Sequence, residues 1–118
     1  MPEIRVKRVY DPVEEGDGVR ILVDRTWPRG LSKEKARIDL WLRELAPSPD
    51  LCRWYGHVPE RWPEFLARYH AELAQKSAAL AKLRELGRQG PITLLFASAE
   101  RERNNALALK LFLEKEGR

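Results

Sequence analysis

Two arginines, an aspartate and a tryptophan fall within eight residues, VDRTWPRG at 23–30, directly after an apolar run. The proline that follows Trp27 disfavours helical backbone there, and the glycine that follows Arg29 permits a sharp reversal. The arginines are therefore expected on a stiff, non-helical loop. A guanidinium offers phosphate or carboxylate a planar pair of donors and stays charged at every working pH. We predict that Arg25 and Arg29 bind an anion together, with Trp27 stacking on the ligand or closing the site against water.

The same stretch also has structural interpretations. An arginine behind a strand often pairs with an acid, and Asp24, Asp39 and Glu44 are available here. Trp27 equally fits a hydrophobic core. Asp24 stands at the strand end, where it either acts as a catalytic base or orients an arginine. We carry Asp24 as a catalytic candidate and leave these alternatives open.

His57 is the second catalytic candidate. It lies in CRWYGHVPE, beside a glycine in a loop-like setting, and an imidazole is a common general acid or base. The alternative is a loop histidine that takes part in no chemistry. Cys52 is the only cysteine, so a disulfide within the chain and a cysteine metal cluster are excluded. We expect Cys52 to be a small, buried or half-buried residue, because no histidine stands next to it to activate the thiol.

Small polar side chains follow the other predicted strands. Ser48 comes after the third, Ser98 ends the fourth, and Asn104 and Asn105 open the helix behind it. Ligands of open α/β sheets bind outside the carboxyl ends of the strands, where these segments converge. We therefore predict that these four residues take part in ligand binding at that edge. Both asparagines are also good helix starters.

Several motifs are absent from the chain. It contains no G-x-G-x-x-G, no P-loop, no H-E-x-x-H, no zinc spacing of cysteine and histidine, and no G-x-S-x-G. We accordingly expect no cofactor and no metal. Whether the protein is an enzyme is left open by the sequence.

Four strands are predicted to position these residues. Alternating apolar residues in 3–11 indicate a half-buried strand, and 19–24 is apolar enough for a central one. The stretch 37–45 fits both a strand and a helical stripe, and we favour the strand. The run PITLLFAS at 91–98 is the clearest strand in the chain.

Helices alternate with these strands. They are predicted over 33–36 behind Ser32, from Ser48 and Pro49 to near Gly56, over 59–86, and over 104–116. Gly87 is predicted to cap the third helix, whose regular part begins near Pro63. The pattern predicts an α/β fold, with residues 1–118 as a single domain. A small, mainly parallel sheet of about four strands carries helices packed on both faces.

Composition supports one globular domain. The chain has 118 residues, 43% hydrophobic and 34% charged. No apolar run approaches the roughly 18 residues needed to span a bilayer. The beginning of the chain lacks the apolar core of a signal peptide, so we expect a cytoplasmic protein without a membrane partner.

The net charge of +4 raises an alternative function, because basic proteins often bind nucleic acid. In that case Arg5, Lys7 and Arg8 would be among the phosphate contacts. Basic and acidic residues alternate through the second half of the chain, which is typical of solvated helix faces instead. We therefore favour a small phosphate- or carboxylate-bearing ligand, a nucleotide among the candidates. A third alternative is a protein-interaction module that uses exposed tryptophans.

Three stretches carry a family resemblance: DGVRILVDRTWPRGLSKEKA, LAPSPDLCRWYGH and PITLLFASAERERNNALAL. In this order they resemble the YeaO-like family of cytoplasmic proteins, grouped under domain of unknown function 488. The likeness covers the chain from Arg8 to Leu113. It implies a compact α/β domain and no established activity. It supports a site that includes Arg25, Trp27, Arg29, Ser48, His57 and Asn105 without assigning their roles.

Overall fold

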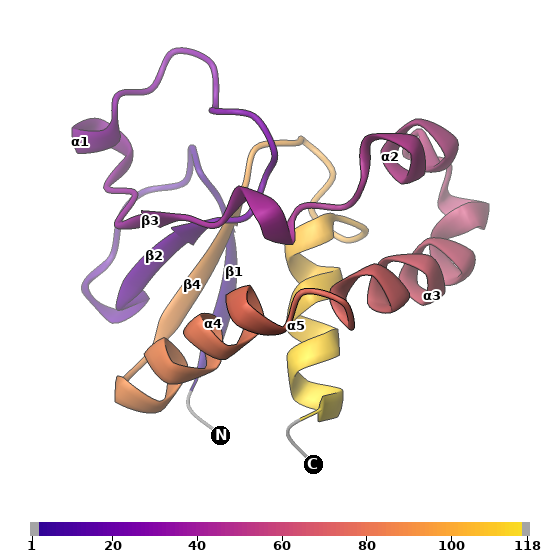
Figure 1. The fold of residues 1–118 in the computed structure, drawn as a ribbon. Coiled ribbons are helices and arrows are strands. Elements are labelled where there is room, and N and C mark those ends of the chain that lie inside the picture. The colour runs from indigo at the N-terminus through magenta and orange to yellow at the C-terminus, as the bar shows by residue number, and fades with distance from the viewer. Residues whose placement is uncertain (1–2, 117–118) are drawn as a thin grey trace.

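Four parallel strands form a single sheet in the order β1-β4-β2-β3 in the computed structural model, which describes residues 3–116. The strands are β1 (Ile4–Arg8), β2 (Val19–Leu22), β3 (Leu40–Trp41) and β4 (Ile92–Phe96) (Figure 1). The predicted α/β class and the parallel sheet are confirmed. Because every strand runs in the same direction, the segments that follow them leave from one edge of the sheet.

Five helices connect or follow the strands. They are α1 (Lys33–Ala36), α2 (Pro49–Tyr55), α3 (Trp62–Leu73), α4 (Ser77–Gln89) and α5 (Asn105–Glu116), with 3-10 turns at Glu15–Asp17, Arg43–Leu45 and Pro59–Arg61. The predicted N-terminal caps of α1 and α2 are confirmed. Ser32 Oγ accepts the Lys35 N–H at 3.1 Å and Ser48 Oγ accepts the Leu51 N–H at 3.2 Å. Within residues 3–116, no helix has the length and apolar character needed to cross a membrane.

The two faces of the sheet are covered unequally. Alternate residues of the central strands point to opposite faces, so Ile21 and Leu94 join the larger core, and Leu22 and Leu95 a smaller one. Helices α2 to α5 all contribute to the larger core. The short helix α1 and the segment that carries Trp27 cover the other face, and Figure 1 shows α1 set apart from the four other helices.

The single helix predicted over 59–86 is broken. Helix α3 ends at Leu73 and α4 begins at Ser77. A straight helix over the predicted range would be about 42 Å long, whereas the longest dimension of the molecule is 35 Å. The break folds the second half back over the sheet. Gly87 is not a cap as predicted: it lies inside α4, and Gly90 follows the last helical residue.

The strand predicted over 37–45 is much shorter than expected. Only Leu40 and Trp41 pair with β2, at the edge of the sheet. A 3-10 turn then directs Leu45 into the core, where it is fully buried. The sequence was ambiguous here because the segment makes one strand contact and then one helical turn, so each pattern fits part of it.

Candidate ligand-binding site

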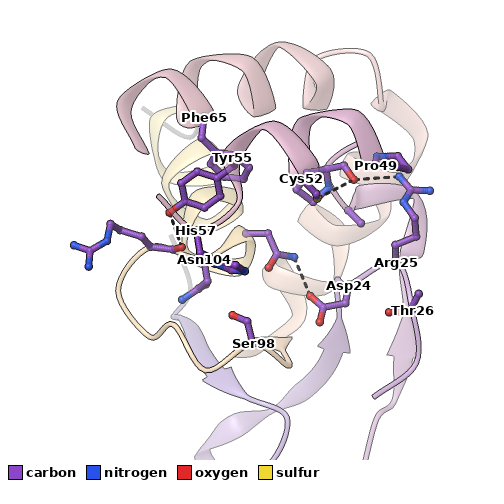
Figure 2. Close-up of a pocket in the computed structure, with 14 residues that line it drawn as sticks. Asp24, Arg25, Thr26, Pro49, Cys52, Tyr55, His57, Phe65, Ser98 and Asn104 are labelled. Carbon is purple, nitrogen blue, oxygen red and sulfur yellow. Dashed lines mark hydrogen bonds between the residues drawn. The ribbon is translucent and has the colours of Figure 1, made fainter. Parts of the chain in front are cut away.

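A cavity of about 320 Å³ opens at the carboxyl edge of the sheet. The ends of β2 and β4 form its floor, and α2 and the beginning of α5 form its walls (Figure 2). The residues that line it are Asp24, Arg25, Thr26, Ala46, Pro47, Pro49, Cys52, Tyr55, His57, Phe65, Ser98, Arg103, Asn104 and Asn105. The cavity therefore lies where parallel α/β sheets usually bind their ligands.

Six of the nine predicted site residues line this cavity. They are Asp24, Arg25, His57, Ser98, Asn104 and Asn105. The other three, Trp27, Arg29 and Ser48, are not among the lining residues. The segments that follow β2 and β4 thus converge as expected. The two arginines do not: Arg25 lines the cavity and Arg29 lies outside it.

Asp24 ties three elements together at the floor of the cavity. Its Oδ2 accepts the Ala97 N–H at 2.9 Å and its Oδ1 accepts the Asn105 amide at 3.0 Å. Its carbonyl oxygen accepts the Trp41 indole N–H at 2.7 Å. Burial raises the pKa of the Asp24 carboxyl, although the bonds from Asn105 and Ala97 oppose the shift. Within residues 3–116, Asp24 makes no hydrogen bond or ion pair with an arginine.

Arg25 brings a positive charge to the cavity wall without a counter-charge. Its Nη2 donates to the Pro47 carbonyl at 3.2 Å, and no carboxylate of residues 3–116 forms an ion pair with it. The acids offered as partners by the sequence are not used: Asp39, for example, accepts the backbone N–H of Arg20 at 2.9 Å. The Nε of Arg25 is buried and has no hydrogen-bond partner in the described part of the chain.

Two further cavity residues carry a buried polar atom without a partner. In residues 3–116, Ser98 Oγ and Arg103 Nε, like Arg25 Nε, make no hydrogen bond. Arg103 pairs through Nη2 with Glu100 at 3.2 Å, so its charge is partly balanced. Buried polar groups are nearly always hydrogen-bonded in folded proteins, and an exception calls for an explanation such as a bound group. All three unpartnered atoms belong to residues that line one cavity.

Aromatic rings form the opposite wall. Tyr55 stacks on Phe65 with ring centroids 4.5 Å apart, and its hydroxyl donates to the Arg103 carbonyl at 3.1 Å. His57 lies 5.6 Å from the Tyr55 ring and has a left-handed backbone, with φ at 58°, which is uncommon for a residue other than glycine. Figure 2 shows Tyr55 and Cys52 across the cavity from Ser98 and Asp24.

The two asparagines hold the beginning of α5 at the cavity. Asn104 Oδ1 accepts the Leu107 N–H at 2.8 Å and so caps the helix. The Asn105 amide donates to Asp24 and, at 3.1 Å, to the Val23 carbonyl. These contacts fix the positive end of the helix dipole at the cavity, where it favours a negative charge.

Cys52 is exposed, so the prediction that it is a buried or half-buried residue is wrong. It lies on α2 beside the cavity, with Sγ 3.8 Å from the Pro47 carbonyl. Partial desolvation raises the pKa of the Cys52 thiol, and the charge of Arg25 opposes the shift. A raised pKa disfavours the thiolate, which is the reactive form.

Trp27 and Arg29 lie away from the cavity for a common reason. Trp27 packs in the smaller core, with its ring 5.3 Å from that of Trp41, and its indole N–H donates to the Leu31 carbonyl at 2.7 Å. This contact draws the loop over the opposite face of the sheet. Arg29 is exposed, and its carbonyl accepts the Tyr10 hydroxyl at 3.1 Å.

Ser48 joins two helices. Its hydroxyl donates to one Glu72 oxygen at 2.6 Å, and its N–H donates to the other at 2.8 Å. With Oγ also accepting the Leu51 N–H, the side chain is fully engaged as the cap of α2.

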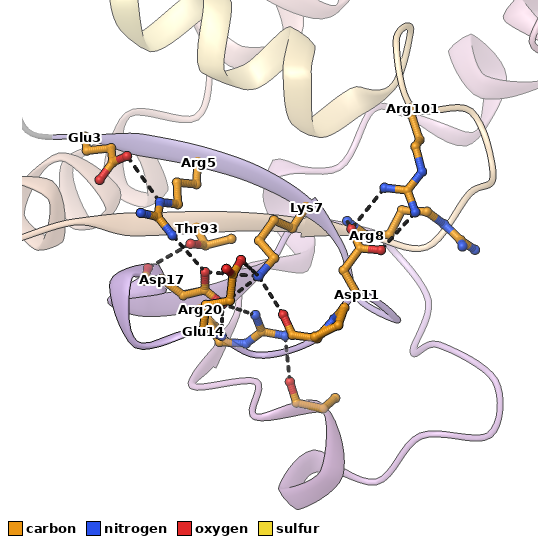
Figure 3. A network of polar contacts seen from close by, with 12 residues as sticks. Glu3, Arg5, Lys7, Arg8, Asp11, Glu14, Asp17, Arg20, Thr93 and Arg101 are labelled. Carbon is orange, nitrogen blue, oxygen red and sulfur yellow. Dashed lines mark hydrogen bonds and ion pairs between the residues drawn. The ribbon is translucent and has the colours of Figure 1, made fainter.

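The basic residues of β1 are engaged within the fold. Lys7 and Arg5 bond to Asp17 (Figure 3). The Arg8 guanidinium donates to the Ser98 and Ala97 carbonyls at 2.8 and 3.1 Å. Phosphate contacts by these residues would require the internal bonds to be exchanged for new ones.

Sequence reasoning missed Tyr55, Phe65 and Arg103 as residues of the site. Tyr55 is two residues before His57, and Arg103 directly precedes the predicted asparagines, so proximity to predicted residues was the available signal. Phe65 lay on a helical stripe that indicated only core packing. Within residues 3–116, no group of three histidine, cysteine, aspartate or glutamate side chains is placed to hold a metal ion.

The fold and the site define a small α/β protein with a cavity of ligand size at the carboxyl edge of a parallel sheet. The chain belongs to the YeaO-like proteins of the DUF488 family, which confirms the resemblance seen in the sequence. The profile of a family described as "Inactive DUF488-N3 subclade" matches residues 3–118.

Relatives span almost the whole chain. An uncharacterized protein of Mycobacterium tuberculosis is 44% identical over 110 residues, which cover 93% of this chain and 92% of the relative. The uncharacterized protein YeaO of Escherichia coli is 42% identical over 107 residues, 90% of this chain and 92% of its own length. No solved structure matches the chain significantly.

Proposed function

We propose that this protein binds a small anionic ligand, bearing a phosphate or a carboxylate, in the cavity at the carboxyl edge of its sheet. The observation that carries the proposal is a set of three buried polar atoms without a partner in residues 3–116, all from cavity residues: Arg25 Nε, Ser98 Oγ and Arg103 Nε. Each is a hydrogen-bond donor, and the oxygens of a phosphate or carboxylate are acceptors. Satisfying such donors recovers the free energy that their burial costs.

The charges around the cavity support an anion over a cation or a neutral ligand. Arg25 has no counter-ion in residues 3–116, and the positive end of the α5 dipole adds to its field. Asp24 opposes them. Burial raises the pKa of its carboxyl and so weakens this opposition, whereas the hydrogen bonds from Asn105 and Ala97 favour the charged form. Arg25 is therefore the principal anion-binding residue in this proposal, without the contribution of Arg29 that the sequence led us to expect.

We infer that binding, without catalysis, is the role of the site. The matched subclade is described as inactive. The two catalytic candidates also lack the usual arrangement of a working base. Asp24 is occupied by structural hydrogen bonds, and His57 makes no hydrogen bond to a nucleophile or an orienting carboxylate in residues 3–116.

Calorimetric titration with inorganic phosphate and ribose 5-phosphate tests this proposal. Arg25→Gln should weaken binding about tenfold to a hundredfold, because a hydrogen bond to a charged group contributes about 1.5–3 kcal/mol. Arg29→Gln is the matched control: it removes the same charge from the same loop but outside the cavity, so its affinity should equal that of the wild type. If both variants lose affinity equally, or if neither variant loses affinity, the proposed site is contradicted.

A further inference from the structure

Tyr10 is an exposed aromatic residue at the same edge of the sheet as the cavity. It follows β1 and is 44% exposed, more than any other large hydrophobic residue in 3–116. Its hydroxyl donates to the Arg29 carbonyl at 3.1 Å. The side chain is thus tethered at its tip while much of its surface remains in contact with solvent.

A cation supports the same ring. The Arg8 guanidinium lies against Tyr10, with Cζ 5.1 Å from the ring centroid. Arg8 is itself held by its two hydrogen bonds to the carbonyls of Ala97 and Ser98. Backed by Arg8 and tethered to Arg29, the ring is an oriented aromatic surface that has already lost the side-chain freedom that ligand binding would otherwise cost.

Arg8 connects this aromatic surface to the cavity through Ser98. Ser98 lines the cavity with its side chain and accepts the hydrogen bond of Arg8 with its carbonyl. Tyr10 is therefore only two contacts removed from a cavity residue that carries one of the unpartnered atoms. This chain of contacts leads from the cavity toward β1 and the ring.

We propose that Tyr10, backed by Arg8, is a stacking subsite for the planar ring of a ligand whose anionic group occupies the cavity. The inference rests on the proposed function and narrows the ligand to a class, nucleoside monophosphates and similar phosphates that carry an aromatic ring. Nucleobases stack readily on aromatic side chains, and a guanidinium next to the stack strengthens it. Arg29 enters this subsite only through its backbone carbonyl, which accepts the Tyr10 hydroxyl.

Calorimetry with AMP and ribose 5-phosphate, which share the sugar phosphate and differ in the base, tests the subsite. The wild type should bind AMP about 5-fold to 100-fold more tightly than ribose 5-phosphate, the range expected for stacking one base on an aromatic ring. Tyr10→Leu should remove this difference and leave the affinity for ribose 5-phosphate unchanged. Tyr10→Phe keeps the ring and should retain the preference for AMP.

The outcomes separate this inference from the proposed function. If AMP binds no more tightly than ribose 5-phosphate, or if Tyr10→Leu leaves the AMP affinity unchanged, the subsite is refuted. The proposed anion binding in the cavity is then still supported by the binding of ribose 5-phosphate. If neither compound binds, both proposals fail. Because Tyr10 is exposed, Tyr10→Leu should unfold at the urea concentration of the wild type, so that a loss of affinity reports on stacking.

Discussion

Replacing Asp17 with asparagine should destabilise the protein strongly. The Asp17 carboxylate is 1% exposed and neutralises cations from two strands (Figure 3). Its oxygens lie 3.1 Å from Lys7 Nζ, 2.6 Å from Arg20 Nη1 and 3.4 Å from Arg5 Nη1. Arg20 is itself only 2% exposed. An amide would leave Arg20 buried without a counter-charge and turn a donor toward one of the cations, while Arg5 and Lys7 would keep their pairs with Glu3 and Glu14.

Removing one partner of a buried ion pair costs about 3–5 kcal/mol. The total stability of a domain is about 5–15 kcal/mol. Since urea lowers stability by about 1–3 kcal/mol per molar, the midpoint of urea unfolding should fall by about 1 M or more. Glu14→Gln is the control, because Glu14 pairs with the same Lys7 at 3.0 Å but is 64% exposed. Its loss should cost at most about 1 kcal/mol.

Acid provides a second readout of the same carboxylate. Burial alone would raise the pKa of Asp17, but hydrogen bonds from the Glu14 N–H, Lys7 and Arg20 outweigh it and hold the pKa below its ordinary value of 3.8. The stabilisation is therefore complete above that value and is lost as the pH falls through the lowered pKa. Asp17→Asn should show a flatter acid dependence than the wild type. If Asp17→Asn and Glu14→Gln unfolded at the same urea midpoint, the role assigned to Asp17 in this network would be refuted.

Two further predictions concern the turns and the cavity. Replacing Gly18 or Gly30 with alanine should destabilise the protein by about 1–2 kcal/mol, because φ is +63° at Gly18 and +76° at Gly30 and a residue with a Cβ disfavours positive φ. Only at Gly18 would the new Cβ also meet a backbone atom, 1.9 Å from the Pro91 oxygen. Gly18→Ala should therefore lower the urea midpoint more than Gly30→Ala does, and equal midpoints would contradict the steric argument. Burial raises the pKa of Asp24, so the affinity for sulfate, whose charge stays constant, should rise as the pH falls toward that pKa. Calorimetry in a His57→Gln background, which removes the titration of the histidine, measures this affinity. A sulfate affinity that decreases as the pH is lowered would show that Asp24 does not act on the ligand.

Much of the fold follows from local patterns in the sequence. The apolar runs around Ile21 and Leu94 predicted the two central strands, because only a strand covered on both faces is apolar throughout. Ser32 and Ser48 marked helix starts through their side-chain oxygens. The break after Leu73 had no such signal, since it arises from the length of the helix relative to the size of the molecule.

The candidate site was predictable in part for the same reason. Asp24 and Arg25 come shortly after the end of β2, and Ser98 shortly after the end of β4, so the parallel arrangement alone brings them together. The position of Arg29 depends on which face of the sheet receives Trp27. That choice is made by packing against Trp41 in the smaller core, a tertiary contact that periodicity does not reveal. Two arginines four residues apart were therefore predicted to act together, although only Arg25 lines the cavity.

We propose that the Arg25 side chain, whose Nε is buried and has no hydrogen-bond partner within residues 3–116, is the anion-binding group of the cavity. Nuclear magnetic resonance observes the Nε–H signals of arginine side chains directly during a titration with inorganic phosphate. The Arg25 signal should shift and reach saturation with a single dissociation constant, and the signal of the exposed Arg29 should stay in place. A saturating shift at Arg29 with none at Arg25, or shifts that grow linearly without saturation at both, would contradict the account.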